Sequence, residues 1–544
     1  MMRRNLLLPG LIGLLSLAVS ACGGKDGSLA ITSPSSFDSG TGLTYDMDRQ
    51  IAETSYLVNP RFRHTYHYMA PVGWINDPNG FGFYQNKIHL FSQSNAYAPV
   101  WGGIHWGHQT STDFIKWKLV HTALAPDEKY DAGGCFSGTS LEYNGTQYLY
   151  YTSIDGTGDQ NQSVAYSTDG LHYTKSPSNP IITGAMLPKG LSHSDFRDPK
   201  VFMANGRFYA LLVCKKTDNS AAKVIVQFSS DNPDNDWQYD GIVLSSSKPG
   251  GMFECPDYET IDGTDVILAS AQNLSASGMA YFAQNGDAQV YATGTYEPVS
   301  HSFVFDKTAD SFDELDKGFD FYAAQTMKVP DGRTVLTAWM STWSTPRIFA
   351  TTDNWWGAYV LPRELSVRAG HVYQAPVREI ANYYTKQETA EALSLAAGSY
   401  TPQAAFRGNR QMISFDIDVA NSEATAQTGI KVFANANGTT FTSVYYDRAL
   451  GGVVFSREHS DGIPTVGESG DLSYSGKRIA EVEPVNGKIH LQLFLDVSSL
   501  EVFINDGYYT MTGYTASAND NVGFFSENGS GRIENIEQAA IEVD

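Results

Sequence analysis

The sequence predicts an all-β protein, a five-bladed β-propeller followed by a β-sandwich. Two observations lead to this prediction. Aromatic residues make up 12% of the chain, 50 of its 544 residues are glycine and only 18% are charged, which suits short strands joined by tight turns. A turn signal followed by a strand-like run also recurs about every 60 residues, an interval that fits a four-stranded blade with generous loops.

The composition excludes several other classes of protein. With 42% hydrophobic residues the chain is globular rather than disordered, and its length allows two folded domains without disulfides. Lys and Arg total 37 against 59 Asp and Glu, a formal net charge of −22. Because nucleic-acid binders need positive potential, we expect no nucleic-acid partner. The sequence leaves the oligomeric state open.

The N-terminus has the features of an export signal. Arg3 and Arg4 precede an apolar stretch over residues 6–19. This stretch is shorter than the roughly 20 residues of a membrane-spanning helix, so it predicts a signal peptide over residues 1–21.

The end of this signal resembles a bacterial lipobox. It reads Leu17-Ala18-Val19-Ser20-Ala21-Cys22, which implies that Cys22 carries a lipid anchor in a membrane. The residue after Cys22 is Gly23. In the sorting pattern of Gram-negative lipoproteins, an Asp at this position would retain the protein at the inner membrane. We therefore expect an exported lipoprotein at the outer membrane or cell surface, with a flexible tether over residues 22–58. An ordinary secretory signal with a chance cysteine is the alternative.

The predicted propeller covers residues 59–370. Five turn signals each precede a strand-like run: Gln85-Asn86, Asn144-Gly145, Asn205-Gly206, Asp262-Gly263 and Asp331-Gly332. Asn-Gly and Asp-Gly supply the positive φ angles that a two-residue hairpin turn requires. The similar spacing favours five repeated blades over an ordinary β-sandwich with chance spacing.

The strand before each turn carries residues suited to a binding site. Blade by blade, these strands contain Asn76-Asp77, Phe136-Ser137-Gly138, Arg197-Asp198, Glu254-Cys255-Pro256-Asp257, and Tyr322 with Gln325. Because the first strand of a blade lines the propeller axis, we expect three carboxylates far apart in sequence to face one funnel. Taken singly, Asp77 could belong to a turn, Glu254 could be a solvated charge, and Asp198 could form a structural ion pair.

Three of these segments resemble the signatures of glycoside hydrolase family 32, which contains invertases, inulinases, levanases and sucrose-6-phosphate hydrolases. The segments are Trp74-Ile75-Asn76-Asp77-Pro78-Asn79-Gly80, Phe196-Arg197-Asp198-Pro199 and Glu254-Cys255-Pro256-Asp257. The resemblance runs from about residue 60 to the C-terminus and includes residues 318–323, 361–365 and 496–507. The chain departs from the family at Phe91-Ser92-Gln93-Ser94-Asn95-Ala96, where two tyrosines are replaced by serines, and over residues 343–356.

The resemblance implies a retaining glycoside hydrolase that cleaves β-D-fructofuranosyl bonds. Such an enzyme needs a carboxylate nucleophile and a carboxyl acid about 5 to 5.5 Å apart. The resemblance assigns Asp77 as nucleophile and Glu254 as general acid and then base. It assigns Asp198 as the transition-state stabiliser, oriented by Arg197. Crowding of charges should separate the pKa values of Asp77 and Glu254, leaving Glu254 protonated when it acts as acid.

The same resemblance implies which residues bind the sugar and which substrates are cleaved. The sugar-binding residues would be Trp74, Asn76, Gln93, Trp101, Phe136, Ser137, Arg197 and Tyr322. Aromatic rings suit the apolar faces of sugars, and amides and hydroxyls suit their hydroxyl groups, although one or two of the aromatic residues, Trp106 included, are expected in the core. No metal and no organic cofactor is expected.

We expect exo-acting cleavage of sucrose and of fructans, either levan or inulin. Sucrose-6-phosphate is a less expected substrate, because export separates the protein from cytosolic phosphosugars. An endo-levanase or a fructosyltransferase of the same family is an alternative. An alternative of another class is a catalytically inactive fructan-binding lipoprotein at the cell surface.

A second domain follows the propeller. Residues 371–400 are predicted as a linker with a short helix that begins at Pro376, and residues 401–544 as a β-sandwich. Apolar residues alternate along two runs, Leu491, Leu493 and Leu495, then Leu500, Val502 and Ile504, before the turn Asn505-Asp506-Gly507. We expect this domain to brace the propeller. A carbohydrate-binding module is the alternative, although residues 401–544 contain no tryptophan.

Three cysteines remain besides Cys22. Cys135, Cys214 and Cys255 cannot all pair, and their spacing is not that of a zinc site. We therefore expect small, buried, unpaired side chains.

Overall fold

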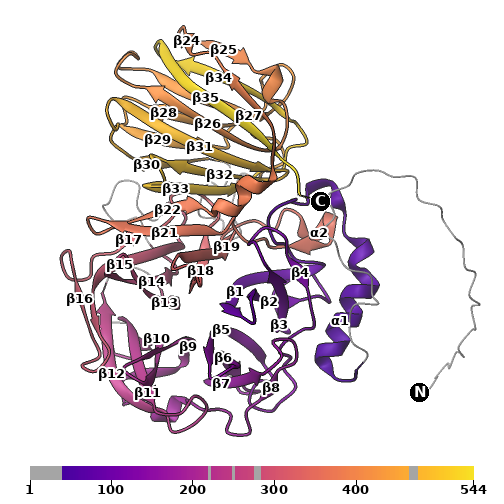
Figure 1. Ribbon diagram of the computed structural model, residues 1–544, viewed down its shortest axis with the longest axis vertical. Helices are drawn as coiled ribbons and strands as arrows, with labels where there is room; N and C mark the ends of the chain where they lie inside the picture. Colours follow the sequence, from indigo (N-terminus) through magenta and orange to yellow (C-terminus); the bar gives the residue numbers. More distant parts are fainter. Residues whose placement is uncertain (1–39, 219–221, 248–250, 275–283, 465–475, 544) are drawn as a thin grey trace, which may run out of the picture.

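The computed structural model describes residues 40–218, 222–247, 251–274, 284–464 and 476–543. The predicted signal peptide, Cys22 and the predicted tether as far as residue 39 lie outside these residues. Five antiparallel sheets follow one another around a central axis, and a sandwich of two further sheets packs against one side of them (Figure 1). This confirms the predicted fold class. No helix within the described ranges is both long and apolar enough to cross a bilayer.

Each of the first three blades is built outward from the axis. Blade one contains β1 (Gly73–Tyr84), β2 (Lys87–Asn95), β3 (His105–Ser111) and β4 (Lys118–Leu119). Blade two contains β5 (Gly134–Tyr143), β6 (Thr146–Ile154), β7 (Gln160–Ser167) and β8 (Thr174–Lys175). After the short 3-10 helix η4 (Gly184–Met186), blade three contains β9 (Leu191–Ala204), β10 (Arg207–Lys216), β11 (Lys223–Ser230) and β12 (Gln238–Ser246).

The last two blades complete the ring. Blade four contains β13 (Phe253–Ile261), β14 (Thr264–Ala271), β15 (Ala288–Glu297), β16 (Ser302–Phe305) and β17 (Asp313–Glu314). Blade five contains β18 (Tyr322–Lys328), β19 (Thr334–Trp339), β21 (Arg363–Arg368) and β22 (His371–Pro376). The first strands β1, β5, β9, β13 and β18 contact one another in a closed ring, so they line the axis.

The turn signals lie where the sequence predicts them. At Gln85-Asn86, Asn144-Gly145, Asn205-Gly206 and Asp262-Gly263 both residues have positive φ, as a two-residue hairpin turn requires. The fifth hairpin is longer, and within Asp331-Gly332 only the glycine has a positive φ, 93°.

Residues close to the two ends of the propeller close the ring. The short helix α2 (Ala350–Asp353) leads into β20 (Trp355–Trp356), which pairs in parallel with the start of β1. Beside it, the backbone N of Tyr359 donates to the carbonyl of Tyr68 at 2.8 Å. The first and last blades are thus joined by backbone hydrogen bonds.

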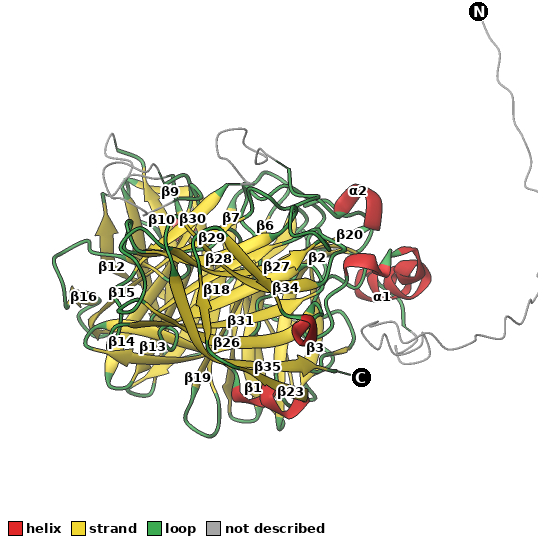
Figure 2. Ribbon diagram, turned by 90° about the horizontal axis from the view of Figure 1, so that it is seen from above, coloured by secondary structure: helices red, strands yellow, loops and turns green. Residues whose placement is uncertain are grey.

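Helix α1 (Leu43–Thr54) packs at the outer edge of blade one, on the side of β4 (Figure 1), and lies outside the strands in the view from above as well (Figure 2). Met47 and Ile51 are buried in this contact, and Asp48 Oδ1 accepts hydrogen bonds from the backbone N and Oγ1 of Thr122. The 3-10 turns η2 (Ser55–Leu57) and η3 (Pro60–Phe62) follow. The prediction of a flexible tether over 22–58 is therefore wrong for residues 43–58, because an apolar face and a carboxylate find partners on the propeller.

The prediction of a linker over residues 371–400 is wrong for most of that range. Strand β22 pairs with β21 along its whole length and completes blade five. The 3-10 helix η5 (Arg378–Tyr383) lies where a short helix is predicted, and β23 (Tyr384–Ala390), β24 (Leu393–Leu395) and β25 (Ser399–Pro402) already belong to the sandwich. These segments are strands because each satisfies its backbone hydrogen-bonding groups by pairing at the edge of a sheet.

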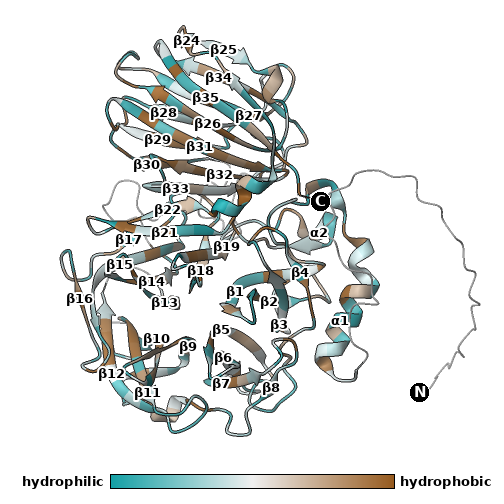
Figure 3. Ribbon diagram, in the orientation of Figure 1, coloured by the Kyte–Doolittle hydropathy of each residue, from teal (hydrophilic) through white to brown (hydrophobic). Residues whose placement is uncertain are grey.

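The sandwich consists of two sheets. One contains β23, β24, β26 (Arg410–Asp418), β31 (Lys488–Asp496), β32 (Ser499–Ile504), β33 (Tyr509–Tyr514) and β35 (Gly531–Ile541). The other contains β25, β27 (Gln427–Ala434), β28 (Thr442–Asp447), β29 (Gly452–Ser456), β30 (Lys477–Glu481) and β34 (Asn521–Glu527), with the 3-10 helix η6 (Ala404–Phe406) after β25. The alternating apolar residues predicted in β31 and β32 are all buried in the core between the sheets. Figure 3 shows hydrophobic and hydrophilic residues interleaved along the strands of the sandwich.

Buried charges join the sandwich to the propeller. His67 Nδ1 lies 2.7 Å from Asp496 Oδ2, and its Nε2 lies 2.7 Å from Glu501 Oε1. Arg363 Nη2 holds the other oxygen of Glu501 at 2.6 Å. Although burial alone lowers it, hydrogen bonds to the two carboxylates raise the pKa of His67 to about 9. A charged imidazolium therefore links the two domains, which agrees with a bracing role for the sandwich.

Candidate active site

The first strand of every blade is bulged at the end where the predicted site residues lie. The pairing register shifts between Ile75 and Pro78, Cys135 and Gly138, Arg197 and Lys200, Glu254 and Asp257, and Tyr322 and Gln325. A β-bulge redirects side chains and is common beside active sites. Asp198 and Cys255 also have positive φ angles, 62° and 45°, and such strained residues gather at functional sites.

Asp77 is held in one orientation by neighbours from three blades. Its Oδ2 accepts hydrogen bonds from Ser137 Oγ at 2.5 Å and Gln93 Nε2 at 3.2 Å, and its Oδ1 accepts one from Asn76 Nδ2 at 3.1 Å. The Cys255 thiol lies 3.5 Å from Oδ2. The residue is 7% exposed, so the carboxyl is fixed and nearly buried.

Asp198 enters the same pocket from β9. Its backbone N donates to Thr152 Oγ1 at 2.8 Å, and its Oδ2 accepts a hydrogen bond from the backbone N of Cys255 at 2.9 Å. Arg197 Nε forms an ion pair with the same oxygen at 3.9 Å, which is too long for a hydrogen bond. The hydrogen bond that holds Asp198 therefore comes from the Cys255 amide, and an orienting role for Arg197 stays a prediction.

Arg197 instead holds Glu254. Its Nη2 and Nε donate to Glu254 Oε1 at 2.9 and 3.3 Å. The other oxygen, Oε2, accepts hydrogen bonds from Gln272 Nε2 at 2.7 Å, Tyr322 Oη at 2.9 Å and Trp343 Nε1 at 3.4 Å. Donors from blades three, four and five thus position this carboxyl, whose side chain is 14% exposed.

Burial and like charges raise the pKa values of two of these carboxyls. Loss of hydration raises the pKa of Asp77 to about 6; the charge of Glu254 adds to this shift and the Ser137 hydrogen bond opposes it. Burial also raises the pKa of Asp198 to about 7, with Arg197 opposing the shift and Glu254 adding to it. Asp77 and Asp198 therefore keep their protons to a higher pH than exposed aspartates do, and which carboxyl donates the proton stays a prediction.

Of the eight predicted sugar-binding residues, Arg197 and Tyr322 hold Glu254, and the other six fall into two groups. Asn76, Gln93 and Ser137 are almost fully buried and form a hydrogen-bonded network that fixes Asp77. Trp74 is buried behind them and donates through Nε1 to Asn76 Oδ1 at 2.8 Å. These four side chains support the reactive carboxyl from behind.

The second group is an aromatic rim close to Glu254. The Trp101 ring lies 5.5 Å from that of Phe136 and 6.4 Å from that of Trp343, both edge-on. Trp101 is 43% exposed, and Trp343 reaches Glu254 through its Nε1. Apolar ring faces therefore meet solvent directly beside the buried carboxyls.

Sequence reasoning missed several contacts of the carboxyls. Trp343 lies in a segment noted only for its departure from the family, and no local signal marks Thr152 or Gln272. Gln325, expected at the funnel, instead joins two other blades, since its Nε2 donates to the Gly138 carbonyl at 2.8 Å and its Oε1 accepts from the Phe81 backbone N at 3.3 Å.

The side chains best placed to hold a metal lie outside this pocket. Within the described part of the chain, the three that come close enough together are His64, His67 and Asp496, at the contact with the sandwich. Cys135, Cys214 and Cys255 are buried and unpaired, as predicted.

Two family models cover most of the chain. The N-terminal domain of glycosyl hydrolases family 32 matches residues 67–376, and the C-terminal domain of that family matches residues 377–540. The chain is 32% identical over 477 residues to a sucrose-6-phosphate hydrolase of Zymomonas mobilis, an alignment that covers 84% of this chain and 87% of that protein. It is 31% identical over 528 residues to a levanase of Bacillus subtilis, covering 91% of this chain and 72% of the levanase.

Solved structures show the same architecture. A GH32 beta-fructofuranosidase of Bombyx mori in complex with sucrose aligns with a TM-score of 0.77 and 28% identity, over 92% of this chain and 98% of that one. A fructan 1-exohydrolase of Cichorium intybus shares the fold with a TM-score of 0.75 and 21% identity, over 89% and 98% of the two chains. With matches along both domains, the chain belongs to glycoside hydrolase family 32 and is a hydrolase of that family.

Proposed function

We propose that the protein is a retaining, exo-acting β-fructosidase that releases fructose from sucrose and from a fructan, levan or inulin. The observation that carries this proposal is the cluster of Asp77, Asp198 and Glu254, from three different blades. Cys255 contacts both aspartates, and Arg197 pairs with Asp198 and Glu254. The relatives support the bond that is cleaved, since they include a levanase and a beta-fructofuranosidase bound to sucrose.

In the first step, the carboxylate of Asp77 attacks C2 of the fructosyl unit. Glu254 gives its proton to the departing glycosidic oxygen, so the leaving sugar departs with a neutral hydroxyl group instead of a negatively charged oxygen. Ser137, Gln93 and Asn76 keep Asp77 ionised and aligned, because their hydrogen bonds favour the charged form.

In the second step, water releases the fructosyl group. Glu254, now ionised, removes a proton from this water, which attacks C2 and frees Asp77 with retained configuration. Asp198, fixed by the Cys255 amide, accepts hydrogen bonds from fructose hydroxyls as the oxocarbenium-like state forms. The rim of Trp101, Phe136 and Trp343 supplies apolar faces to the sugar beyond the cleaved bond.

The depth of the carboxyls supports exo action. Asp77 and Asp198 are 7% and 5% exposed. The end of a fructan chain reaches such recessed carboxyls more easily than the middle of a long chain does. Endo-levanase and fructosyltransferase activity differ from this proposal in their products. A binding protein without catalysis is disfavoured, since such a protein has no need for this arrangement of all three carboxyls.

We also propose that the enzyme is an exported lipoprotein anchored through Cys22 at the outer membrane or cell surface. The lipobox-like sequence supports this location. Replacement of Cys22 by Ser should release the protein from membranes without changing its activity on sucrose, measured by fractionation and fructose release. A wild-type protein that is already free of membranes after export would contradict the proposal.

Chromatography of the products from sucrose, inulin and levan tests the activity. Exo action gives fructose as the only early product of a fructan, endo action gives oligosaccharides, and transfer gives products longer than the donor. Asp77→Asn should fold normally but lose several orders of magnitude in kcat, whereas Asp231→Asn, at an exposed ion pair with Arg207, should retain it. Retention of more than about a tenth of kcat in Asp77→Asn would remove Asp77 as the nucleophile.

A further inference from the structure

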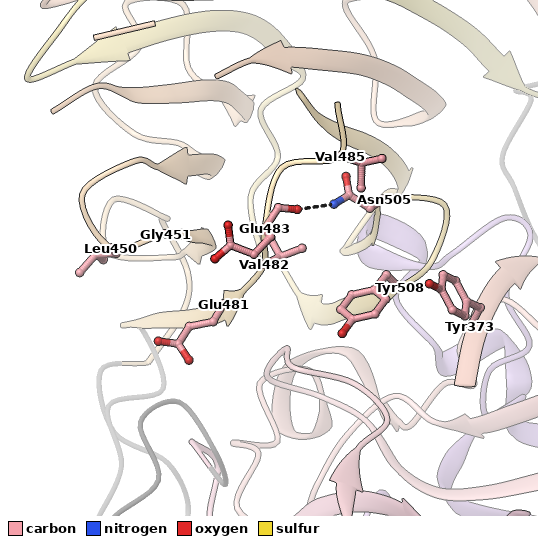
Figure 4. Close-up of a pocket in the computed structure, with 9 residues that line it drawn as sticks. All are labelled: Tyr373, Leu450, Gly451, Glu481, Val482, Glu483, Val485, Asn505 and Tyr508. Atoms are coloured by element: carbon pink, nitrogen blue, oxygen red, sulfur yellow. Dashed lines mark hydrogen bonds between the residues drawn. The ribbon is translucent and has the colours of Figure 1, made fainter. Parts of the chain in front are cut away.

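A groove of about 570 Å³ lies where blade five meets the sandwich (Figure 4). It is lined by Tyr373, Leu450, Gly451, Glu481, Val482, Glu483, Val485, Asn505 and Tyr508. Tyr373 belongs to β22, the outermost strand of blade five, and the other residues belong to the sandwich. None of these residues lies on an innermost strand of a blade, so the groove is separate from the candidate active site.

One end of the groove is aromatic. The rings of Tyr373 and Tyr508 lie 5.5 Å apart at an angle of 70°. The His371 ring stacks on Tyr508 at 4.0 Å and 15°, which supports one face of the tyrosine from behind. Both tyrosines are only half-buried. The Arg368 guanidinium lies over one face of the Tyr373 ring, 4.6 Å from its centre, so only the uncovered ring surface is open to a ligand.

The rest of the groove mixes carboxylates with apolar surface. Glu481 and Glu483 are exposed and lie between the tyrosines and Leu450 (Figure 4). Leu450 and Val485 are 44% and 58% exposed, although each is a large apolar side chain.

The aromatic end is rigid because both domains hold it. His371 Nε2 lies 2.6 Å from the carbonyl of Tyr508, and the backbone N of Gln374 donates to the carbonyl of Gly507 at 3.0 Å. The turn of the sandwich and the last propeller strand thus form one wall, and a ligand would bind there without first ordering the chain.

We propose that this groove is a second carbohydrate-binding site, which holds a segment of a neutral oligosaccharide or polysaccharide. Its lining includes two carboxylates, and the neighbouring Arg368 guanidinium already packs on Tyr373, so the groove favours a neutral ligand over an anionic one. Carboxylate oxygens accept hydrogen bonds from sugar hydroxyls, and tyrosine, leucine and valine surfaces match the apolar faces of sugar rings. The volume falls within the range of about 300 to 1,000 Å³ that is usual for small-ligand sites.

The ligand we infer is a fructan chain, and this inference rests on the proposed β-fructosidase function. The groove and the active site belong to one chain, so a polymer long enough to reach both has a raised effective concentration of its free ends at the active site. A disaccharide gains nothing from such binding. The groove should therefore promote cleavage of levan or inulin and leave cleavage of sucrose unaffected.

The test is to fill the groove with a charged side chain. Val485→Arg places a guanidinium beside Glu483 and blocks the space, and Leu450→Arg does the same from the other end. Val299→Arg is the matched control, because Val299 is a 77% exposed valine of blade four outside the groove. Each substitution is made in the full chain, in the active enzyme and in the Asp77→Asn protein, which measures binding without turnover.

Binding to levan and inulin is measured by affinity electrophoresis of the Asp77→Asn proteins. We expect Val485→Arg and Leu450→Arg to raise the Kd for one of these fructans about tenfold and Val299→Arg to change it less than twofold. In the active enzyme, kcat/KM for that fructan should fall about tenfold while kcat/KM for sucrose stays within twofold.

Two results would overturn the groove as a fructan site: unchanged fructan binding in both groove variants, or equal losses on sucrose and fructan. Failure of the Asp77→Asn parent to bind either fructan would do the same. Failure of the wild type to cleave any fructoside would refute the proposed activity instead, since binding by the Asp77→Asn parent is measured independently.

Discussion

Removal of the Ser137 hydroxyl should raise the pH that the enzyme needs for activity. This hydroxyl donates a 2.5 Å hydrogen bond to Asp77 Oδ2 inside a buried network, and it opposes the burial that raises the pKa of Asp77 to about 6. Asp77 must be ionised to attack, so kcat/KM of the wild type should fall as the pH drops below about 6. In Ser137→Ala the ionised form loses a donor, and the pKa of Asp77 must rise further.

The size of the shift follows from the strength of that hydrogen bond. A hydrogen bond to a charged group contributes about 1.5 to 3 kcal/mol, and about 1.4 kcal/mol corresponds to one pKa unit. The acid limb of the profile should therefore move upward by about one to two pH units.

The assay is kcat/KM for sucrose between pH 4 and 9 in the wild type and in Ser137→Ala. The control is Ser140→Ala, because Ser140 lies on the same strand but donates to the Gly80 carbonyl at 2.8 Å. An acid limb that stays in place or moves downward in Ser137→Ala would show that Asp77 does not control it. An equal shift in Ser140→Ala would assign the effect to the strand rather than to the hydrogen bond.

Three further predictions concern the acid/base residue and the buried histidines. Glu254→Gln should cleave sucrose very slowly yet still react with a fructosyl donor that has an activated leaving group. Added azide should restore turnover on that donor and give a fructosyl azide of retained configuration. If NMR shows an α-configured azide product instead, a covalent intermediate on Asp77 is excluded. His67 has its pKa raised from 6.5 to about 9, so its contribution of about 3 kcal/mol should be fully present below pH 6.5 and disappear as the pH rises through 9. Denaturant unfolding should show this loss in the wild type and not in His67→Gln. Burial lowers the pKa of His89 to about 4 and that of His108 well below its usual value. The stability that these neutral histidines contribute above pH 6.5 should therefore be lost as the pH falls through 4. An unchanged acid unfolding midpoint in the His89→Gln, His108→Gln double variant would contradict this.

The candidate site shows where local pattern is sufficient and where it fails. Asp77, Asp198 and Glu254 are identified because each lies on the strand before a turn signal, and the repeat places equivalent strands around one axis. The partner of Arg197 depends on the bulge in the next blade, which no local pattern reveals. Thr152 and Gln272 are single polar residues in otherwise ordinary strands, and only contacts between blades distinguish them.

The sequence by itself determined the repeat of hairpins, the sandwich strands and the three carboxyls. These features depend on short-range rules: positive φ at Asn-Gly and Asp-Gly turns, alternation of apolar residues along a strand, and motifs a few residues long. Only the tertiary structure decided that residues 43–54 form a helix packed on blade one and that residues 371–376 complete blade five. It alone placed His67 between Asp496 and Glu501, because burial, hydrogen bonding and charge pairing depend on neighbours that lie hundreds of residues away in the chain.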